Sequence, residues 1–478
     1  MADLGKPAAA DTATAVDDQP ELKRVMGPKL LLLFIVGDIL GTGIYALTGQ
    51  VAAEVGGAAW VPFLVAFGVA LLTAFSYLEL VTKFPQAAGA ALYTHKAFGI
   101  HFVTFLVCFT VMCSGITSAS TASRAFAANL AKGIGMDEPA PGLILGVALG
   151  FMALVMLVNF RGVGESVKAN VVLTLVELSG LALVVVVGLF AITAGRADWS
   201  QVVAFETPDD KNVFLAVTTA TSLAFFAMVG FEDSVNMAEE TKDPSRIFPK
   251  VMLTGLTITG IIYVLVSICA VALVPLGELA GSDTPLVSVV EAGAPGFPTA
   301  DVLPFISMFA VANSALINML MASRLLYGMA KQEVLPPPLA KVHPTRRTPW
   351  VAILFTTALA FSLITYVSFA SDDAISLLGG TTSLLLLAVF AVVNVAVLRL
   401  RRDRVDHEHF VTPTVLPVLG AVVCLYLVTP LSGRPVDQYE IAGALLVLGV
   451  VLWAITWSVN RAVYAKRTFM RDPSDLSG

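Results

Sequence analysis

Four acidic residues lie in long apolar stretches of this sequence, where a charge is costly. They are Asp38, Glu177 and the adjacent pair Glu232 and Asp233. An ionisable side chain inside a membrane-spanning segment is rare and is a candidate functional group by default. We expect these carboxyl groups to exchange a proton, to hold a cation or to contact a positively charged part of a substrate.

Two of these apolar stretches are interrupted next to the acids. Gly41-Thr42-Gly43-Ile44 follows Asp38, and Gly230 precedes Glu232, about 190 residues later. Irregular backbone at membrane depth is tolerated only inside protein or beside a water-filled cavity. Glycine-interrupted segments in corresponding positions of two halves point to a transporter of inverted repeats and to its binding site. The alternative is that both glycines are packing notches, since glycine is common in membrane helices.

The two interruptions predict different chemistry. The amides of Thr42, Gly43 and Ile44 lie at a helix N-terminus, which favours an anion such as an α-carboxylate. The carbonyls that end the first half of the other helix favour an α-ammonium group. Aromatic side chains beside them can cover a substrate, with core packing as the alternative. The expected substrate-binding residues are Ile39, Gly41, Thr42, Gly43, Ile44, Phe226, Ala227, Met228, Val229 and Phe231.

The composition predicts a membrane protein built from helices. Of the 478 residues, 57% are hydrophobic and 13% are charged, whereas a soluble domain has about 25% charged residues. Apolar runs of about 20 residues, enough to cross a bilayer as a helix, recur along the chain. We expect an all-α integral membrane protein with about twelve spans. The expected spans are 29–54, 58–81, 99–131, 142–160, 168–194, 212–240, 248–275, 300–330, 350–369, 374–399, 414–430 and 440–464.

The basic residues predict the orientation of these spans. About five-sixths of them fall in the segments on one side, and the other side holds only Lys132, Arg196, Lys211 and Arg434. Basic segments face the cytoplasm, so we expect both termini there, in a plasma or inner membrane. Residues 1–25 and 466–478 are expected to be cytoplasmic tails, the first of them disordered.

Other classes of function find no support. There is no phosphate-binding glycine loop or nucleophilic triad, and the five histidines are scattered. Cys108, Cys113, Cys269 and Cys424 lie in apolar runs and are expected to be core residues. We therefore expect no enzyme activity, no metal, no cofactor, no nucleic acid and no obligatory protein partner. The expected partners are a small-molecule substrate and the lipid bilayer.

Several motifs resemble the amino acid–polyamine–organocation (APC) transporters, in particular the cationic amino acid transporter branch. They are Gly41-Thr42-Gly43-Ile44, the segment 84–93, Gly230-Phe231-Glu232, the segment 238–244, and Ser323-Arg324 with the residues up to Pro344. The resemblance implies a five-plus-five inverted repeat of the leucine-transporter fold, over 26–195 and 211–400, with two additional helices over 401–465. It also implies an aromatic gate at Phe226 and a functional acid at Glu232.

Three positions depart from that resemblance. Asp38 stands where relatives often have a small residue. The resemblance places Glu177 at a position where many proton-coupled relatives have a lysine. The explanation of ion coupling that depends on this lysine therefore does not apply to this chain. Ser114 stands near where cationic amino acid transporters have a glutamate, which weakens the inference of arginine or lysine as substrate. Burial favours a protonated Glu177, and a nearby cation would keep it ionised.

Together these features predict a secondary active permease that imports amino acids by alternating access, with proton symport as the expected coupling and sodium as the alternative. A carrier of polyamines or other organic amines is the nearest competing function, because of the acids. A channel or a transporter-like sensor would share the fold without gradient-driven accumulation.

Overall fold

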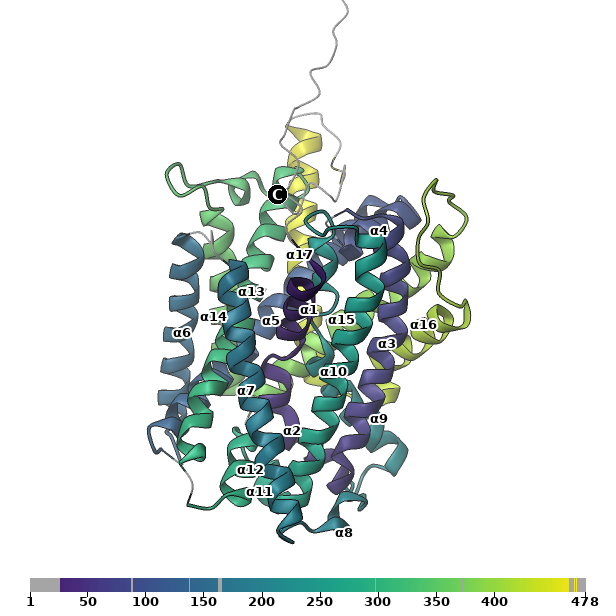
Figure 1. The fold of residues 1–478 in the computed structure, drawn as a ribbon. Helices are drawn as coiled ribbons and strands as arrows, with labels where there is room; N and C mark the ends of the chain where they lie inside the picture. Colours follow the sequence, from purple (N-terminus) through teal and green to yellow (C-terminus); the bar gives the residue numbers. More distant parts are fainter. Residues whose placement is uncertain are drawn as a thin grey trace, which may run out of the picture.

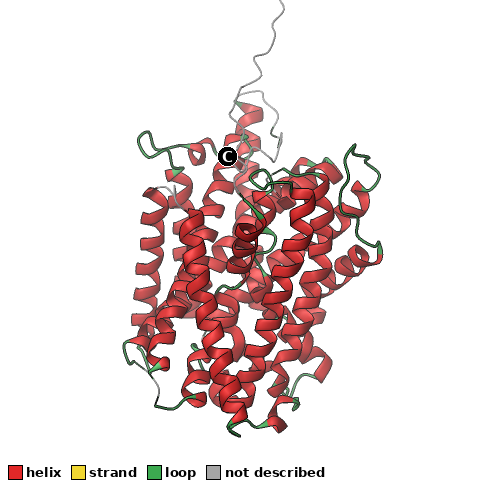
Figure 2. Ribbon diagram, viewed as in Figure 1, coloured by secondary structure: helices red, strands yellow, loops and turns green. Residues whose placement is uncertain are grey.

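The computed structural model describes residues 26–463 except 87–88, 137, 162–165, 297 and 372, together with Thr468 and Met470. The predicted tail 1–25 and most of 466–478 lie outside the described residues. Within the described residues the chain is helical, with two isolated β-bridges and no strand (Figure 2).

Eleven helical stretches are long and apolar enough to cross a membrane, and Val415–Val428 (α16) is a shorter apolar helix. The predicted all-α membrane fold with about twelve spans is confirmed. Two of the eleven stretches are interrupted: α1 (Pro28–Ile39) with α2 (Thr42–Val55), and α9 (Val213–Ala224) with two 3₁₀ turns, η2 (Phe225–Met228) and η3 (Asp233–Met237). The continuous ones are α3 (Trp60–Lys83), α5 (His101–Gly133), α6 (Pro141–Arg161), α7 (Ser166–Thr193), α10 (Pro244–Leu273), α13 (Thr299–Lys331), α14 (Trp350–Ala370), α15 (Ala374–Leu400) and α17 (Val436–Ala462).

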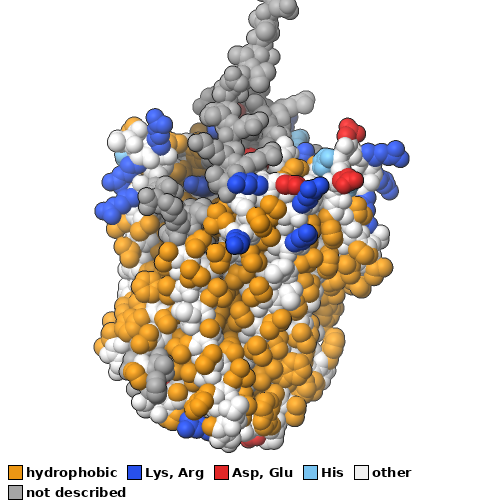
Figure 3. Space-filling view, viewed as in Figure 1, with side chains coloured by type: hydrophobic (Ala, Val, Ile, Leu, Met, Phe, Trp, Pro, Cys, Tyr) orange, Lys and Arg blue, Asp and Glu red, His pale blue; other side chains and the backbone are white. Residues whose placement is uncertain are grey.

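Short helices mark the two ends of the bundle. One end carries α4 (Gly89–Phe98), and the other carries α8 (Trp199–Val202), α11 (Leu276–Ala280) and α12 (Pro285–Gly293) (Figure 1). We call them the α4 end and the α11 end. Figure 3 shows a flank covered by hydrophobic side chains, with Lys and Arg gathered mainly at the α4 end. Such an apolar flank is what a bilayer requires of its protein surface.

The interrupted pair α1 and α2 runs through the middle of the bundle (Figure 1). The side chains that flank the interruption are each at most 2% exposed: Ile35, Ile39, Ile44 and Leu47. The N-terminus of α2, at Thr42, therefore lies inside the bundle. Neighbouring helices surround that pair, with α10 and α7 against α1 and with α9 against α2. The irregular backbone between α1 and α2 is therefore shielded from lipid by protein on all sides, as membrane burial demands.

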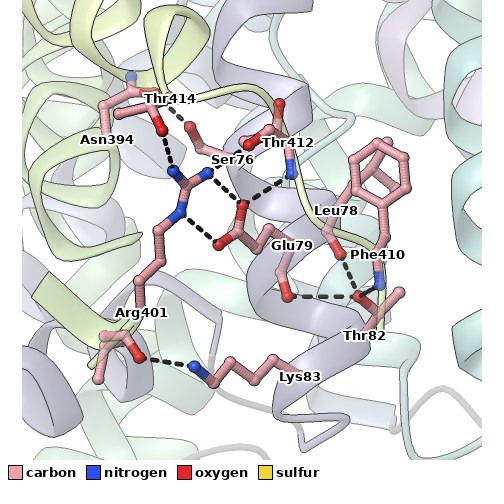
Figure 4. A network of polar contacts seen from close by, with 11 residues as sticks. Ser76, Leu78, Glu79, Thr82, Lys83, Asn394, Arg401, Phe410, Thr412 and Thr414 are labelled. Carbon is pink, nitrogen blue, oxygen red and sulfur yellow. Dashed lines mark hydrogen bonds and ion pairs between the residues drawn. The ribbon is translucent and has the colours of Figure 1, made fainter. Parts of the chain in front are cut away.

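A polar network at the α4 end ties the segment after α15 to α3 (Figure 4). Arg401 donates from Nε to Glu79 Oε1 at 2.8 Å and from Nη2 to Glu79 Oε2 at 2.7 Å. The amide of Thr412 donates to the same Oε2 at 2.9 Å, and Lys83 Nζ donates to the carbonyl of Leu400 at 2.6 Å. Glu79 thus satisfies a guanidinium and a backbone donor from one buried position.

Candidate functional site

The first interruption leaves the N-terminus of α2 open in the middle of the bundle. Leu40 (φ −71°, ψ 58°) and Gly41 (φ −108°, ψ −148°) depart from helical geometry between α1 and α2. No side chain caps α2, so its first amides are available to a ligand. The N-terminal end of a helix also carries partial positive charge. The structure therefore places an uncapped helix N-terminus, of the kind that favours an anion, at Thr42.

The second interruption turns the chain sharply after η2. Val229 is extended (φ −73°, ψ 145°), and Gly230 has φ 124°, a conformation that favours glycine. Glu232 Oε2 accepts a hydrogen bond from the amide of Gly230 at 2.9 Å. This acid therefore holds the amide of a residue that precedes it in the chain.

The two interruptions cross in direct backbone contact. A Cβ placed on Gly43 would lie 2.4 Å from the Cα of Ala227, and one placed on Gly230 would lie 2.7 Å from the carbonyl oxygen of Asp38. Real Cβ atoms do not approach other atoms so closely. Both positions therefore need glycine so that the two chain breaks can meet.

A small cavity lies where the breaks cross. It offers about 20 Å³ to water-sized molecules, which is room for about one water molecule. An amino acid needs these helices to separate before it fits. The first break, the second break and the flanking helices α5 and α13 all contribute to its lining, which consists of Asp38, Ile39, Gly41, Thr42, Gly43, Ser118, Phe226, Val229, Gly230, Asp233, Ser314 and Asn318.

A second cavity continues from this one toward the α4 end. It shares Val229, Asp233 and Asn318 with the first cavity, and Gly89, Ala90 and Ala91 of α4 belong to its lining. Its polar lining also includes Tyr77, Ser114, Glu232, Asn236 and Thr382. The geometry therefore connects the crossing point with one end of the bundle.

The predicted binding residues do not all reach the cavities. Ile44, Ala227 and Met228 are buried beside them without lining them. Phe231 instead packs among aromatic rings, with its centroid 5.9 Å from that of Tyr77 and 5.4 Å from that of Phe390. Phe226 does line the crossing cavity, so of the two phenylalanines expected to bind substrate only Phe226 reaches it.

Glu177 lies in α7 and lines neither cavity. It is fully buried, and neither of its carboxyl oxygens has a hydrogen-bond partner among the described residues. Asp38 Oδ2 and Thr174 Oγ1 also have no hydrogen-bond partner among the described residues. Thr174 packs directly against α1, because a Cβ placed on Gly37 would overlap its Oγ1. An isolated buried carboxylate is far costlier than a neutral carboxyl group. This part of the α1–α7 contact therefore needs a proton or a cation.

Sequence reasoning missed several polar residues of the site. Ser314 and Asn318 lie one turn apart in α13, where the Asn318 amide donates to the carbonyl of Ser314 at 2.9 Å. Two polar residues four apart in an apolar span mark one helix face, and that signal is readable in the sequence. The hydroxyl of Tyr263, which donates to the carbonyl of Ile39 at 2.6 Å, has no comparable signal because the contact joins distant helices.

Comparisons with known proteins agree with this architecture. The family described as amino acid permease matches residues 28–464. The chain is 26% identical over 466 residues to the branched-chain amino acid permease BcaP of Bacillus subtilis (strain 168), covering 94% of this chain and 96% of that protein. It is 25% identical over 450 residues to a methylthioribose transporter of the same organism, covering 91% and 94%.

A plant relative extends the comparison. The chain is 30% identical over 363 residues to the chloroplastic cationic amino acid transporter 9 of Arabidopsis thaliana, covering 71% of this chain and 61% of that protein. The resemblance to the APC superfamily that the motifs carry is thus confirmed over nearly the whole chain. The protein belongs to the amino acid permease family of the APC superfamily, whose members carry small molecules across membranes.

Proposed function

We propose that this permease imports amino acids by alternating access. The observation that carries the proposal is the crossing of the two breaks, with the free amides of α2 beside the end of η2 at one cavity. Opposite partial charges at two helix ends suit the carboxylate and the ammonium of one zwitterion. The relatives named as carriers of branched-chain and cationic amino acids support an amino acid substrate.

The surface charge supports an orientation for import. Lys and Arg gather at the α4 end (Figure 3), and basic segments face the cytoplasm. We place the α4 end and both termini in the cytoplasm of a cell bounded by a plasma or inner membrane. The cavity that runs from the crossing point toward α4 then corresponds to the route of release into the cell. The division into two repeats of five helices is part of this proposal.

Proton symport is the coupling that the buried acids favour. Asp38 borders the crossing cavity. Glu177 lies across the α1–α7 contact, and its carboxyl oxygens have no hydrogen-bond partner among the residues that the structure describes. Protonation makes such groups neutral, whereas loss of the proton leaves a costly charge. Substrate and proton would therefore meet at α1. Sodium is the other cation that these oxygens could hold, and the experiment separates the two.

Uptake into proteoliposomes tests the proposal. Purified protein is reconstituted, and uptake of radiolabelled L-leucine is followed under an inward proton gradient, an inward sodium gradient or neither. We expect saturable accumulation with the proton gradient, and competition by unlabelled amino acids such as alanine. Accumulation that follows only sodium would overturn proton coupling, and the absence of accumulation with every labelled amino acid would overturn the import of amino acids.

An organic amine is the second candidate substrate. Asp38 and Asp233 both line the crossing cavity, and two acids favour a positively charged ligand. A diamine such as putrescine has no carboxylate and no use for the amides of α2. Competition by putrescine without competition by alanine or arginine would establish this second function.

A further inference from the structure

The connection between α16 and α17 carries an arginine that is buried inside the bundle. Arg434 is 5% exposed, and it forms no ion pair with a carboxylate in the described part of the chain. Burial lowers the pKa of Arg434 to about 10, which leaves it charged at neutral pH. A buried cation without a counter-charge is costly unless all its donors are used.

Neutral oxygens from four parts of the bundle use all these donors. A guanidinium has five N–H donors, and Arg434 makes five hydrogen bonds. Nε donates to Leu427 O at 2.7 Å, Nη1 to Gly380 O at 2.9 Å and to Gln438 Oε1 at 2.8 Å, and Nη2 to Ser383 Oγ at 3.0 Å and to Ser222 O at 3.4 Å.

The acceptors on α9 and α15 lie close to Phe226, which lines the crossing cavity. Ser222 of α9 precedes Phe226 by four residues, about one helical turn, and Phe226 lines the cavity. On α15, Gly379 faces Phe226: a Cβ placed on this glycine would lie 3.5 Å from Cδ1 of Phe226. The next residue, Gly380, accepts a hydrogen bond from Arg434. Ser383 completes the contact by donating to the carbonyl of Ser222 at 2.5 Å.

We propose that Arg434 is a positioning residue for the substrate site. Its planar guanidinium group holds α9 and α15 together next to Phe226. Through this arginine, α16 and α17, which follow the ten helices of the two repeats, set the width of the crossing cavity. The proposal rests on the proposed function only in taking that cavity as the substrate site. It assigns α16 and α17 a role in transport besides their contact with lipid.

Arg434→Lys keeps the positive charge and removes the planar guanidinium group. Lysine offers three donors at a single point and cannot reproduce the planar five-donor fork. At least two of the five acceptors therefore lose their hydrogen bond from residue 434. The ends of α9 and α15 then separate more often, and the cavity becomes accessible to reagents in solution.

The rate of cysteine alkylation measures this access without any substrate. Cys108, Cys113, Cys269 and Cys424 are replaced by alanine, and Ser118→Cys places one thiol in the cavity lining. The protein is held in lipid nanodiscs and treated with a membrane-impermeant methanethiosulfonate reagent. We expect Arg434→Lys to raise the rate about tenfold, since charged hydrogen bonds are lost. Uptake of L-leucine by Arg434→Lys, without the cysteine changes, should show a raised KM.

Tyr439→Phe is the matched control. It removes a hydrogen bond of 2.8 Å from Tyr439 to the carbonyl of Val428. This bond lies within the same helical hairpin, and in the described part of the chain Tyr439 makes no hydrogen bond to α9 or α15. Equal alkylation rates in Arg434→Lys and Tyr439→Phe, at matched thermal stability, would overturn the proposal. Should Arg434→Lys not fold, Ser383→Ala takes its place, with about a threefold rise expected from the loss of Ser383's hydrogen bonds. An unchanged rate in Ser383→Ala would likewise overturn it. Because alkylation needs no substrate, this result is independent of whether the protein transports amino acids.

Discussion

Gly43 holds the place where the two chain breaks touch. Replacing it by valine would bring side-chain atoms into the backbone of Ala227, since even a Cβ would lie 2.4 Å from that Cα. We expect Gly43→Val to lower substrate affinity by at least about 100-fold, because the amides of α2 are displaced from the site. Binding of radiolabelled L-leucine to the purified protein measures this.

Gly68→Val is the control for that change. Gly68 lies in α3, with nothing within 4 Å of an added Cβ, so affinity should stay as in the unmodified protein. Wild-type affinity in Gly43→Val would contradict the assignment of the α2 amides to the substrate carboxylate.

Glu177 is the residue whose environment most needs a proton or a cation. Glu177→Gln keeps the shape of the side chain and removes its titration. We expect the variant to lose most of the dependence of uptake on the proton gradient, with a flat profile of initial rate against external pH. Glu54→Gln, at the partly buried pair with Lys211 of 2.7 Å, should keep the normal profile. A normal pH profile in Glu177→Gln would remove this residue from coupling.

At the scale of elements, the α3–α15 network stabilises the α4 end (Figure 4). Glu79 is 1% exposed and holds both Arg401 and the amide of Thr412. Glu79→Ala leaves these donors unpartnered, which should cost about 1–3 kcal/mol after allowance for the partly exposed arginine. Thermal unfolding in detergent measures this. Arg246→Ala, which breaks the exposed pair with Asp243, should cost at most about 1 kcal/mol, and an equal loss in both variants would contradict the account.

The start of α15 should make stability depend on pH. Burial raises the pKa of Asp373 above its ordinary value, the Ser376 amide partly offsets this, and the negative charge of Asp283 adds to the rise. An acid with a raised pKa in the folded state stabilises the fold at low pH and loses this contribution as pH rises through the folded pKa. We expect Asp373→Asn, which keeps an N-cap acceptor for Ser376, to flatten the fall in Tm with rising pH. A slope equal to that of the wild type would contradict this reading.

At the scale of the whole molecule, sequence predicts the spans well and the site partly. The expected spans 142–160 and 374–399 differ little from Pro141–Arg161 and Ala374–Leu400, because apolar length and internal hydrogen bonding are local properties of the chain. Whether Phe226 or Phe231 faces a cavity depends on how distant helices cross. The burial of Arg434 likewise follows from packing between helices, and no periodicity in its segment predicts it.

The central claim is that the crossing breaks bind both charged ends of an amino acid. Thermal stabilisation of the purified protein tests it, since a ligand that binds only the folded state raises Tm. L-leucine is compared with isopentylamine, which lacks the carboxylate, and with 4-methylpentanoate, which lacks the amine. If the claim is right, leucine raises Tm and neither fragment does so at equal concentration. If isopentylamine raises Tm as much as L-leucine does, the claim is contradicted.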